Sequence, residues 1–106
     1  VLAAIGLVVV PLVLGLVLMH TIEIWAYAAA YRAIGAIHDF STALYFSTTT
    51  FTTIGYGDVV LDGDWRLFGA IEAAVGLILF GWSTAFLISV TAYLRAFEHD
   101  WLEAEK

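Results

Sequence analysis

Two long apolar stretches with a short hydroxyl-rich segment between them limit what this chain can fold into. Residues 1–19 contain no charged side chain, and residues 67–94 contain only one, Glu72. About 20 apolar residues are enough for a helix to cross the hydrocarbon core of a bilayer. Hydrophobic residues make up 62% of the chain and charged residues 13%, so we expect a membrane protein rather than a soluble domain.

The segment between the two stretches is too short for a third span. Residues 40–53 are apolar at the start and rich in hydroxyls at the end, and Asp39 or Ser41 supplies an N-cap. Residues 54–64 carry three glycines and three aspartates, which predicts irregular backbone. Such backbone at membrane depth must be buried in protein or line water, and two spans cannot enclose it. We therefore predict an all-α oligomer whose copies together surround a re-entrant helix and its loop.

The loop carries a specific motif. It resembles the potassium-channel signature Thr-x-x-Thr-x-Gly-Tyr-Gly followed by an acidic residue, and here it reads Thr50-Phe51-Thr52-Thr53-Ile54-Gly55-Tyr56-Gly57-Asp58. The likeness covers nearly the whole chain and is strongest to the bacterial two-transmembrane members. It implies a homotetrameric potassium channel of four-fold symmetry in the plasma membrane, with the filter outside and both termini cytoplasmic. The implied pore domain spans residues 1–106, with an outer helix and its extension at 1–32, a pore helix at 39–53, a selectivity filter at 53–58, and an inner helix and cytoplasmic tail at 66–106.

The residue types of this filter suit a dehydrated potassium ion, which needs a ring of oxygens in place of its water. Backbone carbonyls supply the ring if successive residues point their oxygens at one axis, which requires dihedrals of alternating handedness. Glycine adopts these dihedrals at little steric cost. The predicted potassium ligands are Thr53, Ile54, Gly55, Tyr56 and Gly57, with the side chains of Ile54 and Tyr56 facing outward as a buttress. The alternative is a simple turn between helices, but a hydroxyl-rich helix before such a turn has no use in lipid.

Several residues around the filter are candidates for its support: Tyr45, Phe46, Thr49, Thr50, Asp58 and Glu72. Thr49 stands where some relatives carry a glutamate that pairs with the filter aspartate, so Asp58 lacks that partner here. Tyr45 and Phe46 match an aromatic pair of the relatives and could form a cuff around the filter. Generic packing of this pair against the inner helix is the alternative.

Glu72 lies within a span, where a carboxylate is expensive and marks a functional hypothesis by default. On a helix it shares one face with Gly76 and Ser83. We predict that Glu72 lies behind the filter, accepts hydrogen bonds from its threonines or backbone, and is a candidate proton sensor. The alternative is a carboxylate near the membrane interface, in contact with water.

The resemblance also assigns roles along the inner helix. Gly76 matches the glycine that acts as a gating hinge in the family, and Gly81 is a second candidate. Close packing is the alternative, because glycines in spans commonly serve that purpose. The same alignment places Phe80, Thr84 and Ile88 on the wall of the central cavity.

The remaining polar residues carry weaker signals. The three histidines are interpreted as surface residues, although His20 and Glu23, at i and i+3, could bind a metal or sense pH. Asp58, Asp62 and Asp64 are expected to ring the outer mouth and attract cations.

Composition and pattern argue against other functions. A net charge of -6 excludes nucleic acid as a partner, and the absence of cysteine excludes thiol chemistry and disulfides. A membrane enzyme needs paired acid and base groups at one depth. Glu72 has no such partner within a span, so we predict that the chain is not an enzyme. A potassium transporter subunit is the other alternative, but such proteins join several filter units in one polypeptide, whereas this short chain has one. No segment repeats arginine at every third position, so the sequence gives no indication of a voltage sensor. The expected partners are further copies and membrane lipids, and a regulatory domain after Lys106 is left open.

Overall fold

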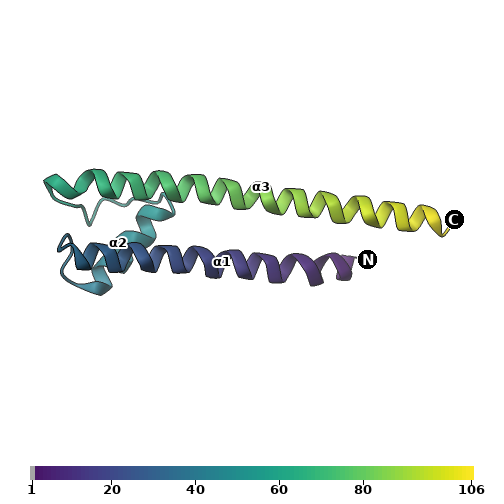
Figure 1. Ribbon diagram of the computed structural model, residues 1–106, viewed down its shortest axis with the longest axis horizontal. Coiled ribbons are helices and arrows are strands. Elements are labelled where there is room, and N and C mark those ends of the chain that lie inside the picture. The colour runs from purple at the N-terminus through teal and green to yellow at the C-terminus, as the bar shows by residue number, and fades with distance from the viewer. Residues whose placement is uncertain (1) are drawn as a thin grey trace.

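The computed structural model describes residues 2–106. Its α-helices are α1 (Leu2–Ala33), α2 (Phe40–Phe51) and α3 (Arg66–Ala104), and the short 3-10 helix η1 (Gly63–Trp65) leads into α3. The helices α1 and α3 lie side by side and antiparallel, and α2 is wedged between them at the end away from the termini (Figure 1). The predicted all-α architecture, in which two long apolar helices flank a short one, is confirmed.

The two long helices leave their apolar side chains outside the chain's own core. Both are long and apolar enough to cross a membrane, and their most apolar stretches are only 0% and 6% buried within the chain. The core helix of a soluble protein would bury such a stretch. Lipid or further copies must therefore cover these surfaces, and the chain is a membrane protein with two candidate spans.

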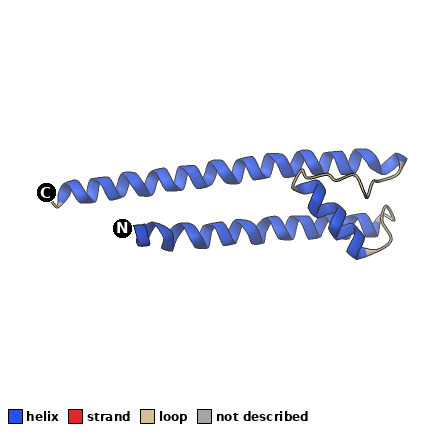
Figure 2. Cartoon of the chain, turned by 180° about the vertical axis from the view of Figure 1, so that it is seen from behind, coloured by secondary structure: helices blue, strands red, loops and turns tan. Residues whose placement is uncertain are grey.

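The connections around α2 follow from local chemistry. After α1, Gly35 adopts a φ of +80° that opens the turn, and Arg32 donates to the carbonyl of His38 at 3.1 Å. The helix α2 ends at Phe51, two residues before the predicted boundary at 53, because Thr53 has a left-handed φ of +64° that an α-helix cannot continue. The loop that follows runs beside α3 back to its start (Figure 2).

The N-terminus of α2 is capped by Asp39, whose side chain accepts from the backbone N–H of Thr42 at 3.1 Å and from its hydroxyl at 2.9 Å. These hydrogen bonds hold the pKa of Asp39 below its ordinary value. A carboxyl group with a lowered pKa stabilises the fold above its unfolded pKa and loses that effect as the pH falls.

We therefore expect Asp39→Ala to lower the melting temperature at neutral pH, and the difference from the wild type to shrink as the pH falls below about 4. Thermal unfolding in detergent across this range measures the effect. Asp62→Ala is the matched control, because Asp62 precedes η1 without a side-chain capping bond. A difference that stays constant with pH would contradict the ionic cap.

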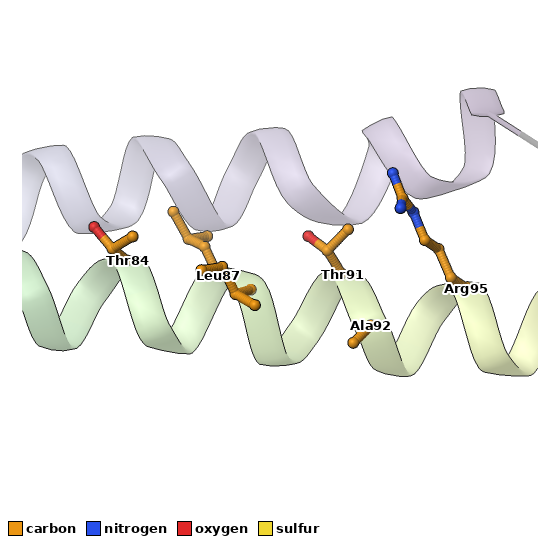
Figure 3. Close-up of a pocket in the computed structure, with 6 residues that line it drawn as sticks. Thr84, Leu87, Thr91, Ala92 and Arg95 are labelled. Carbon is orange, nitrogen blue, oxygen red and sulfur yellow. The ribbon is translucent and has the colours of Figure 1, made fainter.

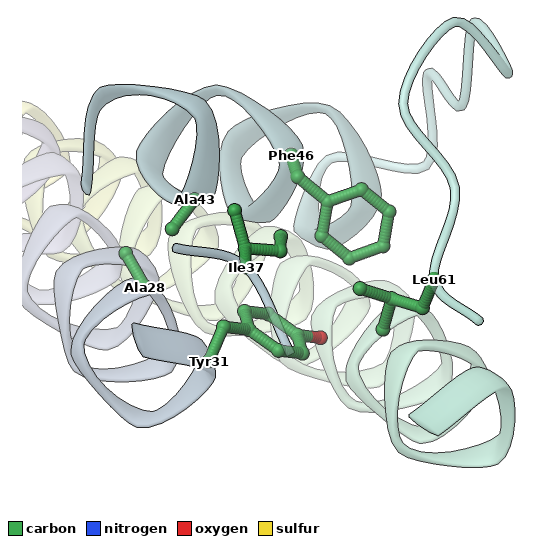
Figure 4. Packing of buried hydrophobic residues seen from close by; sticks show 6 residues of the cluster. All are labelled: Ala28, Tyr31, Ile37, Ala43, Phe46 and Leu61. Atoms are coloured by element: carbon green, nitrogen blue, oxygen red, sulfur yellow. The ribbon is translucent and has the colours of Figure 1, made fainter. Parts of the chain in front are cut away.

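A small apolar core fastens α2 to both long helices. It contains Ala28, Tyr31, Ile37, Ala43, Phe46 and Leu61, which come from α1, α2 and the two loops (Figure 4). The ring of Tyr31 meets those of Phe46 and Phe68 edge to face, each at a centroid distance of 5.3 Å. This core holds α2 in its place between the two long helices.

Candidate functional site

The backbone of the loop after α2 alternates in handedness. The φ angles are +64° at Thr53, +56° at Gly55 and +78° at Gly57, whereas Ile54 and Tyr56 between them are not left-handed. Thr53 thus shares a conformation that the sequence predicts for the glycines alone, and a β-branched residue adopts it only where its surroundings impose it. This alternation can turn successive carbonyl groups toward the same side of the chain.

The last turn of α2 anchors this loop through main-chain hydrogen bonds. The N–H of Gly55 donates to the carbonyl of Thr49, and the N–H of Thr53 donates to that of Thr50, both at 3.0 Å. The hydroxyl of Thr49 is used locally, since it donates to the carbonyl of Phe46 at 3.1 Å. Thr49 and Thr50 therefore hold the loop with their carbonyl groups rather than with their side chains.

The outer end of the loop is held by Tyr45, whose hydroxyl donates to Asp58 Oδ2 at 2.7 Å. This bond raises the pKa of the Tyr45 phenol, because it favours the protonated form. Asp58 therefore has the phenol of Tyr45 as its partner, in place of the glutamate that some relatives carry at the position of Thr49. Phe46 behaves differently from Tyr45, because it is buried against Gly69 of α3, where a Cβ would lie 3.3 Å from its ring.

The side chains of the loop are not covered within one chain. Ile54 is 53% exposed and Tyr56 is 71% exposed. Asp58, Asp62 and Asp64 are also exposed at the same end of the molecule. Large apolar side chains beside an irregular backbone need cover at membrane depth, so this surface is suited to contact with further copies.

Glu72 lies in a buried polar cluster that joins all three helices. It is 0% exposed, its Oε1 accepts from the hydroxyl of Tyr31 on α1, and its Oε2 accepts from that of Ser47 on α2, both at 2.6 Å. The alternative of a carboxylate in contact with water is therefore wrong. The predicted donors were also wrong, because Glu72 faces the middle of α2, before the threonines of its last turn. We call Tyr31, Ser47 and Glu72 the clamp.

Gly76 marks the place where α3 touches the end of α2. A Cβ built on Gly76 would overlap the carbonyl oxygen of Phe51 and lie 2.8 Å from its carbonyl carbon. Nothing lies within 4 Å of a Cβ built on Gly81. The structure thus supports the close-packing interpretation for Gly76, and Gly81 lies on an open stretch of the helix.

The residues assigned to the cavity wall do not share one environment in the single chain. Thr84 and Ile88 line a groove of about 480 Å³ that extends along α3 to Arg95, with Leu87, Thr91 and Ala92 (Figure 3). Phe80 lines a second groove with Thr84 and Leu87, and its ring lies 4.6 Å from that of His20 and 5.5 Å from that of Phe51.

The interpretation of all three histidines as surface residues is wrong for His20, which is only 5% exposed. Its Nδ1 lies 2.9 Å from Glu23 Oε2, and its Nε2 lies 2.8 Å from Ser83 Oγ on α3. His38 and His99 are exposed, as predicted. Among residues 2–106, no group of three or more His, Cys, Asp or Glu side chains gathers as metal ligands.

Sequence reasoning missed Tyr31 and Ser47 as partners of Glu72, and it placed Ser83 on the face of Glu72 without its partner His20. Tyr31 resembles an interfacial aromatic, and Ser47 is one of many hydroxyls in its segment. The only available signal was that a carboxylate and a histidine within apolar helices require buried partners.

Comparison with known protein families matches residues 19–93 to the family described as ion channel. No curated protein and no solved structure gives a match. The matched range covers most of the chain, including the clamp and the whole loop. Ion channels conduct ions and catalyse no covalent reaction, so the prediction that the chain is not an enzyme is confirmed. With two membrane-length helices around a short pore helix, the chain belongs to the ion channel family.

Proposed function

We propose that four copies of this chain form a potassium-selective channel whose filter is Thr53 to Gly57. The observation that carries this proposal is the alternating handedness at Thr53, Gly55 and Gly57. A ribbon of this kind can aim its carbonyl oxygens at a common axis, where they replace the hydration shell of potassium. The hydroxyl of Thr53 adds a further oxygen below the carbonyls. Potassium is the permeant ion, and it occupies the filter sites only transiently during conduction.

The surfaces left uncovered in one chain support assembly around the filter. Exposed apolar residues also lie along α3, among them Leu77 (63%), Ile78 (63%) and Trp82 (74%). Together with Ile54 and Tyr56 they give neighbouring copies an apolar surface to cover. In the tetramer, the carbonyl end of α2 carries partial negative charge and favours a cation in the cavity lined by Thr84 and Ile88.

The proposed orientation places the filter and its aspartates outside the cell and both termini in the cytoplasm. The two termini lie at the same end of the molecule, as two antiparallel spans require (Figure 1). Asp58, Asp62 and Asp64 then face the external solution, where their charge raises the local concentration of cations.

Reversal potentials test the selectivity. For the purified protein in planar bilayers with potassium on one side and sodium on the other, we expect the reversal potential to lie far from zero, in the direction that opposes the flow of potassium. The carbonyl sites match the size and coordination of potassium, and sodium loses more hydration energy there. A reversal near zero would overturn potassium selectivity while leaving an ion channel in place.

A pair of glycine variants separates the filter from its surroundings. Gly55→Ala places a Cβ on a left-handed backbone, so we expect most of the potassium current to be lost. Gly63→Ala is the matched control, because Gly63 has no left-handed φ and open space around it. Equal currents in the two variants would show that the conformation at Gly55 is not needed for conduction.

A further inference from the structure

His20 and Ser83 make a direct contact between the outer and inner helices, well below the clamp. The Nε2 of His20 lies 2.8 Å from Ser83 Oγ, across 63 positions of sequence. Within residues 2–106, this bond and the bond between Tyr31 and Glu72 are the two that join side chains of α1 and α3. Among the described residues, His20 and Ser83 therefore form one of the two side-chain hydrogen bonds between the long helices.

Glu23 sets the direction of this hydrogen bond. Its carboxylate can only accept, so His20 Nδ1, which lies 2.9 Å from Glu23 Oε2, must carry a proton. In the neutral imidazole, Nε2 then has a free lone pair and accepts from the hydroxyl of Ser83. The ring also packs against Phe80 at 4.6 Å and Phe51 at 6.0 Å, which restricts its rotation.

The two bonds bracket two of the three glycines of α3, Gly76 and Gly81. Ser83 follows Glu72 by roughly three helical turns, and His20 precedes Tyr31 by roughly the same distance, so both bonds recur on the same helix faces. Gly76, in contact with Phe51, and Gly81, with open space around it, lie between Glu72 and Ser83. The part of α3 below these glycines is therefore attached to α1 at Ser83.

Around this bond the contacts between α1 and α3 are mostly apolar, and the nearby hydroxyls of Thr21 and Thr84 donate to carbonyls of their own helices. The grooves on either side are lined by residues such as Leu16, Met19, Trp82 and Leu87. In lipid, apolar contacts of this kind are exchanged for lipid tails at little cost, whereas a hydrogen bond has a defined geometry. The bond at Ser83 consequently specifies the position of the lower part of α3 more sharply than the surrounding packing does.

We propose that the hydrogen bond between His20 and Ser83 is a gating latch, which holds the inner helix below Gly81 against the outer helix. This inference rests on the proposed function, since it concerns the opening and closing of that pore. A change of state that swings the lower part of α3 must break the latch in each subunit. His20 and Ser83 are positioning residues, which act through the helix and touch no ion.

The experiment is a double-mutant cycle on open probability in single-channel recordings. His20→Phe keeps a ring against Phe51 and Phe80, and Ser83→Ala removes the hydroxyl. We expect both to move the gating equilibrium constant in the same direction, by roughly fivefold for each subunit, as for one net hydrogen bond. The double variant is expected to match either single variant, because both remove the same bond.

Controls separate the latch from general damage. Ser83→Thr keeps a hydroxyl and is expected to gate like the wild type. Ser89→Ala removes an exposed serine of the same helix and is expected to have no effect. Additive effects in the double variant, shifts in opposite directions, or a Ser83→Thr channel that gates like Ser83→Ala would each overturn the latch.

The same recordings distinguish this proposal from the proposed function. Reversal potentials report selectivity, and the latch variants are expected to leave them unchanged because Ser83→Ala removes only a hydroxyl of α3 and His20→Phe keeps the ring that packs against Phe51. A wild-type channel that conducts without preference for potassium would overturn the proposed selectivity. The double-mutant cycle on open probability would still test the latch, since open probability is defined for whichever ion passes.

Discussion

Gly76→Ala is expected to destabilise the folded protein by about 3 kcal/mol and to abolish its current, because α3 has no room for a methyl group there. The added Cβ would overlap the carbonyl oxygen of Phe51, which is backbone and cannot rotate away. Phe51 also ends α2, so a shift that relieves the overlap displaces the carbonyl groups of Thr49 and Thr50. Those groups hold Gly55 and Thr53, and the loop would lose its geometry.

Thermal or denaturant-induced unfolding in detergent, together with potassium flux into liposomes, measures both effects. Gly81→Ala is the matched control on the same helix, since its Cβ meets nothing within 4 Å. Alanine favours a helix over glycine by up to about 1 kcal/mol, so this variant is expected to fold at least as well as the wild type. A Gly76→Ala protein with normal stability and current would show that this contact between α2 and α3 is not needed.

The pair also distinguishes the two interpretations of the inner-helix glycines. If Gly81 supplies a gating hinge, Gly81→Ala should change open probability while stability is kept. If neither glycine bends, Gly81→Ala should leave open probability unchanged. The structure supports packing at Gly76, so a gating hinge is better sought at Gly81.

The second large effect is expected at the clamp. Glu72→Ala removes both acceptors, leaves the hydroxyl of Tyr31 without its partner and opens a cavity, which together are expected to cost about 3 kcal/mol of unfolding free energy. Ser47 suffers less, because the carbonyl of Ile24 lies 2.8 Å from its hydroxyl oxygen and can accept its single proton once Glu72 is removed. The affected cluster ties α2 to both spans, so we expect potassium flux to fall as well.

Graded variants identify which part of the clamp matters. Glu72→Gln keeps one carbonyl oxygen for Tyr31, and Tyr31→Phe removes one hydroxyl, so each is expected to cost about 1 kcal/mol. Unfolding measurements should rank Glu72→Ala as the least stable of the three. Equal stability of Glu72→Ala and the wild type would mean that the buried carboxylate adds nothing to the fold. A Glu72→Gln channel with unchanged conductance and response to pH would rule out the proton-sensor hypothesis.

The sequence by itself determined the spans, the short helix and the irregular loop. These features are local, because lipid acts on each segment through its own hydrophobicity and glycine carries its conformational freedom at any position. The motif from Thr50 to Asp58 likewise predicted the place of the filter without knowledge of distant residues. Helix periodicity also put Glu72, Gly76 and Ser83 on one face.

Only the tertiary structure decided which groups meet on that face. Glu72 binds a hydroxyl 41 positions away in Tyr31, and Ser83 binds a ring 63 positions away in His20. Those pairings depend on how α1 and α3 are rotated and displaced relative to one another, and a periodic pattern specifies a face but not its partner. For the same reason the sequence left Gly76 open between hinge and contact, and the carbonyl of Phe51 against it became visible only once the three helices were packed together.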